Sequence, residues 1–191
     1  MELTGKTIGI IGFGSIGQAV ARLAEAFGMN VVAYGHRGIP KERLFGNVRA
    51  VSLEELYETS DIISLHCPLT KENQKMIDKD SIAKMKDGVI LVNTSRGGLI
   101  KTDDLIAGIR DHKFFAVGLD VYEEESAYVY EDMSSSILPT STIQRLLSFP
   151  NVTMTSHQGF FTVEALTNIA ETTLENAKTF MDGAEMKNLV H

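Results

Sequence analysis

The chain opens with the stretch Lys6-Thr7-Ile8-Gly9-Ile10-Ile11-Gly12-Phe13-Gly14-Ser15-Ile16-Gly17. Its apolar residues 8–11 predict a buried parallel strand, and the G-x-G-x-x-G spacing of Gly12, Gly14 and Gly17 follows at once. In such a turn the first glycine allows a tight bend, the second lets backbone N–H groups approach a pyrophosphate, and the third permits close packing of helix on strand. The stretch therefore predicts a strand that turns into a helix whose N-terminus can bind an anion.

The residues that follow this turn fit a βαβ unit. Gly28 is suited to end a helix, and residues 31–34 predict a second strand. An apolar helical stripe precedes that glycine and comprises Ala19, Val20, Leu23, Ala24 and Phe27. Three glycines alone would also suit a tight turn that binds nothing, but this context favours a dinucleotide site.

Composition limits the possible partners of the chain. It has 191 residues, 43% of them hydrophobic, and a formal net charge of −7 without a basic cluster. This argues against nucleic acid and anionic membranes as partners, and no residue pattern predicts a metal site. The single cysteine, Cys67, cannot form an internal disulfide, and there is no signal peptide or long apolar run, so a cytoplasmic location is expected.

Strand and helix patterns alternate along the rest of the chain. Further strands are predicted at residues 48–51, 61–66, 88–93, 114–121 and 152–155. Helices are predicted at 73–77 and 81–85, after caps at Ser52 and Thr102, around 146–147, and from 162 to 183. Residues 122–139 form a long acidic loop, which is often a functional feature. The predicted fold class is α/β, a doubly wound parallel sheet of the Rossmann type.

The end of the second strand bears on the choice of cofactor. An NAD site usually carries Asp or Glu there to accept a hydrogen bond from the ribose 2′-OH. Here Gly35 stands in that place, followed by His36 and Arg37. Because an arginine can bind a 2′-phosphate, these three residues favour NADP or relaxed specificity between NAD and NADP. The alternative is that Arg37 is only a solvated loop cation.

Three groups near predicted strand ends could together reduce a 2-oxo acid. Arg96 could bind the carboxylate through two hydrogen bonds, and His157 could donate a proton to the carbonyl oxygen. A nearby Glu125 would favour the protonated imidazole. Spacing alone does not show that the three converge, and each could be an ordinary loop residue.

Five segments, in order, resemble the NAD-binding domain of the D-isomer-specific 2-hydroxyacid dehydrogenases, and the likeness extends over essentially the whole chain. These segments are residues 12–17 (GFGSIG), 65–70 (LHCPLT), 92–97 (VNTSRG), 118–125 (GLDVYEEE) and 155–162 (TSHQGFFT). The aromatic pair Phe160-Phe161 favours the D-lactate dehydrogenase branch of that family.

The resemblance implies roles for individual residues. Arg96 would orient and polarise the 2-oxo acid, His157 would be the general acid and base, and Glu125 would support that histidine. Asp120 would lie near the nicotinamide and His66 near its ribose. Other cofactor contacts would come from Ser15, Ile16, Cys67, Pro68, Asn73, Thr94 and Ser95. Without the family, His66 and Asn73 would be interpreted as ordinary polar residues at a strand end and a helix start.

The resemblance also implies a substrate domain of about a hundred residues before this one, in keeping with usual domain sizes. Residues 1–191 are thus expected to be one dinucleotide-binding domain, in which 184–191 return toward the absent partner. Surface meant for that domain could drive self-association, and a homodimer is expected. The expected parent interconverts pyruvate and D-lactate. The alternatives are an NADPH-dependent glyoxylate or hydroxypyruvate reductase and a dinucleotide-sensing module without catalysis.

Overall fold

The structure is a computed structural model that describes residues 2–123, 141–186 and 188. The chain divides into two compact units, Met1–Ser156 and His157–His191. Most of the predicted loop 122–139, and half of the predicted returning segment 184–191, lie outside the described residues.

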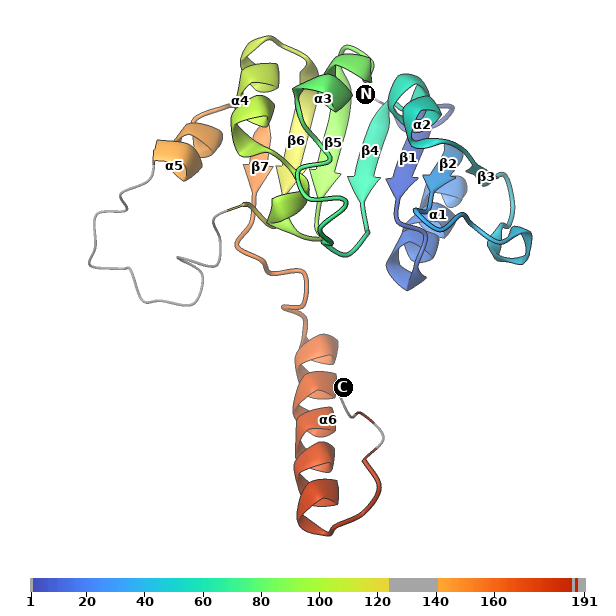
Figure 1. The fold of residues 1–191 in the computed structure, drawn as a ribbon, viewed down its shortest axis with the longest axis vertical. Helices are drawn as coiled ribbons and strands as arrows, with labels where there is room; N and C mark the ends of the chain where they lie inside the picture. The colour runs from blue at the N-terminus through green and yellow to red at the C-terminus, as the bar shows by residue number, and fades with distance from the viewer. Residues whose placement is uncertain (1, 124–140, 187, 189–191) are drawn as a thin grey trace. The chain divides into compact units, whose positions relative to one another are not determined.

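The first unit is built on a seven-stranded sheet in the order β3-β2-β1-β4-β5-β6-β7 (Figure 1). Every neighbouring pair is parallel. The strands are β1 (Thr7–Ile11), β2 (Asn30–Tyr34), β3 (Arg49–Ala50), β4 (Ile62–Leu65), β5 (Val89–Asn93), β6 (Phe114–Leu119) and β7 (Val152–Met154). The order reverses beside β1, as in doubly wound dinucleotide-binding sheets, and confirms the predicted fold class.

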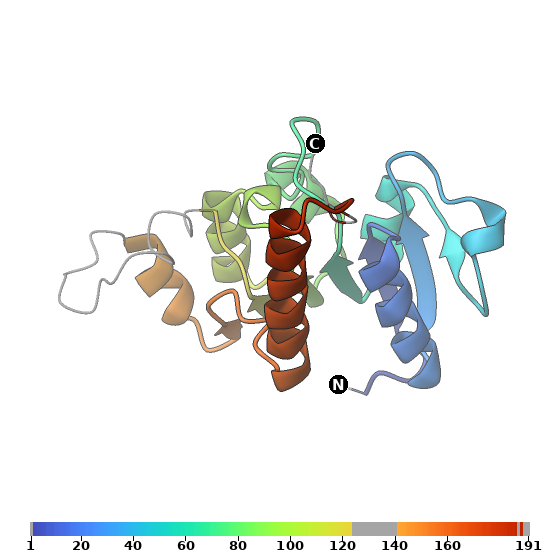
Figure 2. The same cartoon turned by 90° about the horizontal axis from the view of Figure 1, so that it is seen from below.

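Helices cover the two faces of this sheet. The first unit contains α1 (Ser15–Ala26), α2 (Leu53–Thr59), α3 (Lys79–Lys84), α4 (Thr102–Arg110) and α5 (Ser141–Leu147), with short 3₁₀ turns η1 (Lys41–Arg43) and η2 (Gly97–Leu99). Figure 2 shows α1, in blue, on one side of the sheet and the green helices on the other. The alternation along β1 matches this: Ile10 packs in the α1 cluster, and Ile11 packs in the opposite one.

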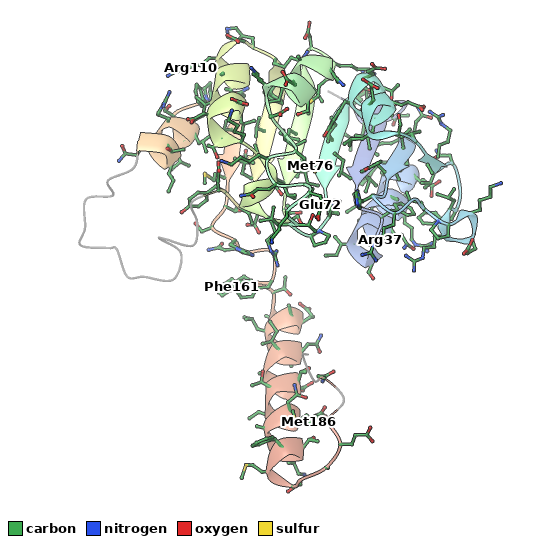
Figure 3. All side chains as sticks on the ribbon, in the orientation of Figure 1. Arg37, Glu72, Met76, Arg110, Phe161 and Met186 are labelled. Carbon is green, nitrogen blue, oxygen red and sulfur yellow. The ribbon has the colours of Figure 1, made fainter. Side chains whose placement is uncertain are left out.

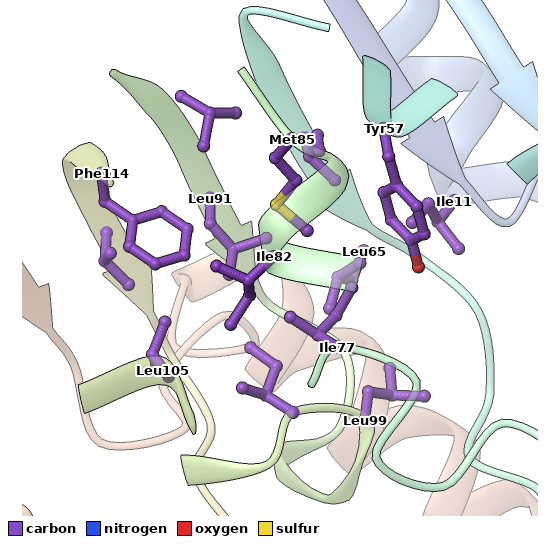
Figure 4. Close-up of a cluster of buried hydrophobic side chains, with 14 of the residues drawn as sticks. Ile11, Tyr57, Leu65, Ile77, Ile82, Met85, Leu91, Leu99, Leu105 and Phe114 are labelled. Atoms are coloured by element: carbon purple, nitrogen blue, oxygen red, sulfur yellow. The ribbon is translucent and has the colours of Figure 1, made fainter. Parts of the chain in front are cut away.

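The larger core lies between the sheet and α2, α3 and α4 (Figure 4). Leu65 and Leu91 of the central strands are fully buried there against Leu56, Ile82 and Leu105, one from each of those helices. β4 is buried along its whole length and is apolar except for Ser64, whereas buried and half-buried residues alternate along β5. Their carboxyl ends are thereby held in fixed positions.

The helix predicted at residues 73–77 does not form. The backbone turns at 71–75, and Ile77 instead makes an isolated parallel bridge with Ile100. The prediction was wrong because the side chain of Asn73 bonds to nearby backbone groups, which gives the segment an alternative to a helix. The helix predicted at 81–85 starts earlier, as α3, with Asp78 as its N-cap.

The predicted cap at Thr102 is also wrong by one position. Thr102 is the first residue of α4, and Lys101 is the N-cap without a side-chain cap bond. The N–H of Thr102 donates instead to Glu123 Oε2 at 3.3 Å. A carboxylate from a distant loop therefore replaces the local cap. The predicted cap at Ser52 is confirmed, since its hydroxyl accepts from the Glu55 N–H at 3.1 Å.

The second unit consists mainly of α6 (Val163–Met181). Thr162 caps it, accepting from the Ala165 N–H at 3.1 Å, and Gly183 follows the helix with φ +64°, as predicted. None of the residues of α6 is buried. Over the part of the chain that the structure describes, no helix is long and apolar enough to span a membrane.

Candidate dinucleotide-binding and catalytic site

The carboxyl ends of six strands lie in one row across the sheet. The paired residues are Tyr34, Ile11, Leu65, Asn93, Leu119 and Met154. The residues that directly follow them are Gly35, Gly12, His66, Thr94, Asp120 and Thr155. Five of these six are predicted site residues, and open α/β sheets bind their ligands at this edge. The register thus brings to one edge groups that are up to 143 positions apart (12 to 155) in the sequence.

The three glycines of the turn after β1 have three different environments. Gly12 has φ +99°, and a Cβ there would lie 2.6 Å from the backbone of His66 and Cys67. A Cβ at Gly17 would lie 2.1 Å from the carbonyl oxygen of Gly12. At Gly14 a Cβ would meet nothing within 4 Å. The first and third glycines are therefore required by the fold, whereas the protein itself gives no steric reason for the second.

The N-terminus of α1 is open to an anion. Gly14 is its N-cap and provides no side-chain bond, and the first turn contains no acidic residue. Ser15 and Ile16 in that turn are exposed. Free N–H groups and the positive end of the helix dipole suit a phosphate, and the open space at Gly14 lets it approach. The residues present therefore fit the pyrophosphate of a dinucleotide.

His66 at the end of β4 is held from within its own strand. Its Nε2 lies 2.9 Å from Oγ of Ser64, which is buried two residues earlier on the same face. Burial lowers the pKa of His66 and so favours the neutral imidazole. Burial likewise raises the pKa of the neighbouring Cys67 thiol. No role for Ser64 was predicted from the sequence. Its position two residues before a strand-end histidine could have indicated a contact between the two side chains.

The loops after β4 and β5 are tied to each other. Ser95 Oγ donates to the Cys67 carbonyl at 2.6 Å. Asn73 Nδ2 donates to the Pro68 carbonyl at 2.8 Å, and Asn73 Oδ1 accepts from the Thr70 N–H at 2.7 Å. The amide of Asn73 thus shapes the loop in which it sits.

Asn93 organises the loop that carries Arg96. Its side chain is fully buried; Nδ2 donates to the Arg96 carbonyl at 2.9 Å and Oδ1 accepts from the Ser95 N–H at 3.0 Å. Arg96 is exposed and donates to the Ser95 carbonyl at 2.7 Å, and Thr94 is exposed beside it. No role for Asn93 was predicted from the sequence. A polar residue at the end of an apolar strand could have indicated that its side chain holds the following loop.

Asp120 at the end of β6 is largely buried and accepts a hydrogen bond from Oγ1 of Thr155, which follows β7. An acidic side chain is thus placed at the carboxyl edge, one strand from the β7 end of the sheet. The hydrogen bond compensates part of the cost of its burial.

The chain after β6 packs closely on the Arg96 loop. A Cβ at Gly97 would lie 2.0 Å from the Tyr122 carbonyl oxygen. Glu123 then pairs with Lys75 at 2.8 Å and accepts from the Thr102 hydroxyl at 3.2 Å. Partial burial opposes ionisation of Glu123, but the bonds from Lys75 and Thr102 outweigh it and lower the pKa of the carboxyl. This network anchors the chain just before the region of Glu125.

The turn after β2 presents an imidazole and a guanidinium side chain to solvent. The Gly38 N–H donates to the Gly35 carbonyl at 2.8 Å, and His36 and Arg37 between them are exposed. A hollow of about 410 Å³ adjoins this turn on the side of β3. Its lining includes Tyr34, Gly35, Ile39 and Val51. A Cβ at Gly35 would lie 3.0 Å from Ile39 Cγ1 and 3.2 Å from the Gly38 carbonyl oxygen.

The three predicted catalytic residues do not belong to one described unit. Arg96 belongs to the first unit and His157 to the second, and Glu125 lies outside the described residues. His157 has φ +52°, an uncommon backbone conformation for a residue other than glycine. Their convergence stays a prediction. Within residues 2–123, 141–186 and 188, no group of three or more His, Cys, Asp or Glu could hold a metal ion.

A parallel sheet with this strand order, this glycine turn and this uncapped helix defines a dinucleotide-binding domain of the Rossmann type. The profile of the family "D-isomer specific 2-hydroxyacid dehydrogenase, NAD binding domain" matches residues 1–159. The chain therefore belongs to this family, and the coenzyme of its domain is NAD by the family's description.

Known relatives agree with this assignment. A 2-hydroxyacid dehydrogenase homolog of Haemophilus influenzae is 45% identical over 99% of this chain and 57% of its own length. D-lactate dehydrogenase of Escherichia coli is 41% identical over 96% of this chain and 56% of its own. The crystal structure of D-lactate dehydrogenase with NAD⁺ from Lactobacillus jensenii superposes with a TM-score of 0.91 at 34% identity, covering 100% of this chain and 57% of that one. The chain thus spans little more than half the length of these relatives.

Proposed function

We propose that this domain binds a nicotinamide dinucleotide across its carboxyl edge and serves an enzyme that transfers hydride between that cofactor and a 2-oxo or 2-hydroxy acid. The observation that carries the proposal is the single row of strand ends that holds Gly12, His66, Thr94 and Asp120. The Gly12–Gly17 turn takes the pyrophosphate. From that turn the cofactor extends along the strand ends of β4, β5 and β6, so that its nicotinamide lies near Arg96 and Asp120. The bound cofactor would supply or accept the hydride.

The residues of this chain then have separate tasks in the proposed reaction. The exposed guanidinium of Arg96 binds the substrate carboxylate and polarises the carbonyl, supported by the loop that Asn93 holds. His157 gives a proton to the carbonyl oxygen in reduction and removes it in oxidation. Glu125 keeps that imidazole oriented and protonated. A substrate domain would complete the pocket and exclude water.

The cofactor contacts follow from position in the row. Gly14, Ser15 and Ile16 face the pyrophosphate; His66, Cys67 and Pro68 line the β4 side with Asn73 as the support of their loop; and Thr94, Ser95 and Asp120 lie toward the nicotinamide. On the β2 side, Gly35 adds no side chain, His36 adds an imidazole and Arg37 adds a cationic guanidinium. We propose that Arg37 binds a 2′-phosphate and that the domain accepts NADP in addition to NAD.

We propose pyruvate and D-lactate as the substrate pair. Relatives named D-lactate dehydrogenase and the aromatic pair Phe160-Phe161 support this choice. A second candidate is an NADPH-dependent reductase of glyoxylate or hydroxypyruvate, which the Gly35-His36-Arg37 turn favours. A sensing module without catalysis is less well supported, because sensing needs neither an exposed Arg96 at the site nor a proton donor.

We further propose a homodimer in the cytoplasm. Ile16 and Leu23 of α1, and Phe27 directly after this helix, are 59–68% exposed along one side. Apolar stripes of this kind commonly mark protein interfaces. The lone Cys67 accords with a reducing compartment.

The catalytic proposal is tested in the parent protein that carries a substrate domain. We expect it to oxidise NADH with pyruvate, and we expect Arg96→Gln and His157→Ala each to lower kcat/KM by roughly 10²- to 10⁴-fold. Lys41→Gln, a change in the exposed η1 turn, is the control. A protein that binds NADH without reducing any 2-oxo acid would support the sensing module instead.

A further inference from the structure

The loops after β2 and β4 flank the glycine turn. Because β1 lies between β2 and β4, residues that follow those two strands border the turn from opposite sides. Figure 3 shows Arg37 and Glu72 at the same edge of the sheet, on these two loops. A cation and a carboxylate thus lie at the end of the proposed site where the β2 loop would meet the adenosine ribose.

Glu72 has a defined place on its loop. Asn73 holds the loop through Pro68 and Thr70, and Ser95 holds its start through Cys67. A hydrogen bond with Thr70 is the main cause that lowers the pKa of the Glu72 carboxyl, and the attraction of His36 adds to it. The carboxylate is therefore ionised and lies within electrostatic reach of the β2 turn.

The balance of charge at this edge bears on cofactor choice. A ribose 2′-OH can donate to a carboxylate, whereas a 2′-phosphate carries a charge between about −1.5 and −2 and is repelled by one. His36 and Arg37 favour the phosphate, and so does Lys71 on the same loop as Glu72. The described loops after β2 and β4 also carry Glu42 and Asp78, but Glu72 is the acid among them whose carboxyl pKa the attraction of His36 lowers.

We propose that Glu72 is a specificity-determining residue that takes the place of the acid missing at Gly35. It favours NAD by facing the ribose from the β4 loop instead of the β2 loop. It also limits the affinity that Arg37 gives to NADP. The inference rests on the proposed binding of the dinucleotide at the Gly12–Gly17 turn.

The test compares the Kd values of NADH and NADPH for the wild type, Glu72→Gln and a control, by nicotinamide fluorescence. Glutamine keeps the size of the side chain and can still accept from Thr70. The control is Glu58→Gln, an exposed acid in the last turn of α2, at the opposite edge of the sheet. We expect Glu72→Gln to tighten NADPH on the order of tenfold at low salt, with NADH unchanged or weaker. Glu58→Gln should change neither.

Salt separates the electrostatic role from a structural one. The gain in NADPH affinity should shrink toward onefold as ionic strength rises, because the charges are exposed and screened. An unchanged ratio of the two Kd values, or equal tightening of both cofactors, would overturn the role of Glu72. Failure of the wild type to bind NADH at all would instead overturn the proposed function. The two failures are thus distinguishable.

Discussion

Gly17 of α1 lies directly on the carbonyl oxygen of Gly12, so close that a single added methyl carbon would sit 2.1 Å from that oxygen. The helix therefore begins in contact with the turn that precedes it. This contact sets the position of the open N–H groups at the start of α1 relative to β1. The stability of the fold and the geometry of the anion site thus depend on the same pair of glycines.

Gly17→Ala should destabilise the domain strongly. The added carbon meets backbone, which cannot rotate away, so α1 must shift, at a cost of roughly 3 kcal/mol. Urea unfolding followed by circular dichroism measures this cost. Ala19→Ser, on the exposed side of the same helix, should cost less than about 1 kcal/mol. Equal effects of the two changes would contradict the packing described for Gly17.

Asn93→Ala should weaken both stability and catalysis. The change leaves the Arg96 carbonyl and the Ser95 N–H without their buried partner, at a cost of about 1–3 kcal/mol for each group. It also loosens the loop that presents the guanidinium, so pyruvate reduction by the parent should show a raised KM. The control Asn30→Ala removes an exposed amide bond to Gly5 and should leave KM unchanged.

Gly35→Asp should shift the cofactor preference of the site toward NADH. The new carboxylate can accept from the ribose 2′-OH and repels a 2′-phosphate, so NADPH should bind at least tenfold more weakly relative to NADH. Its Cβ would lie 3.0 Å from Ile39 Cγ1, a side chain that can move aside, and 3.2 Å from the Gly38 carbonyl oxygen, so the exposed turn must shift by a few tenths of an ångström. Ratios of Kd measured by fluorescence test the prediction, and a preserved preference would show that the β2 end does not face the ribose.

His66 should make the domain less stable below about pH 6.5. Burial lowers the pKa of His66 in the folded state, so in that range the unfolded chain takes up a proton that the folded chain does not. Stability then falls as pH falls, by less than about 1 kcal/mol because the ring is partly exposed to solvent. Above that pH the effect vanishes. Urea unfolding at pH 7.5 and 5.5 should show a smaller pH dependence for His66→Gln than for the wild type.

The strand-end residues could be located from sequence because the strands are short apolar runs bounded by turn residues. Parallel pairing then brings their ends to one edge. The strand order and the row from Tyr34 to Met154 needed the structure, since periodicity within a strand says nothing about its neighbours.

Two predictions of secondary structure were wrong because individual side-chain hydrogen bonds determine the conformation there. A short helix was predicted at residues 73–77, but the side chain of Asn73 bonds to backbone groups of its own loop. Thr102 has the chemistry of a cap, yet Glu123, 21 residues away, supplies the carboxylate. Long-range side-chain bonds of this kind, including Ser95 to Cys67, leave no periodic trace in the sequence.

The most direct test of dinucleotide binding at the glycine turn is the NADH affinity and the unfolding free energy of Gly14→Ala, measured on the same preparation. Gly14 has φ −80° and open space where the methyl group of an alanine would lie, so the change should alter stability by no more than about 1 kcal/mol. The same methyl would occupy the approach of the pyrophosphate, and NADH should bind at least about tenfold more weakly. Unchanged NADH affinity in a stably folded Gly14→Ala domain would contradict the assignment of this turn as the cofactor site.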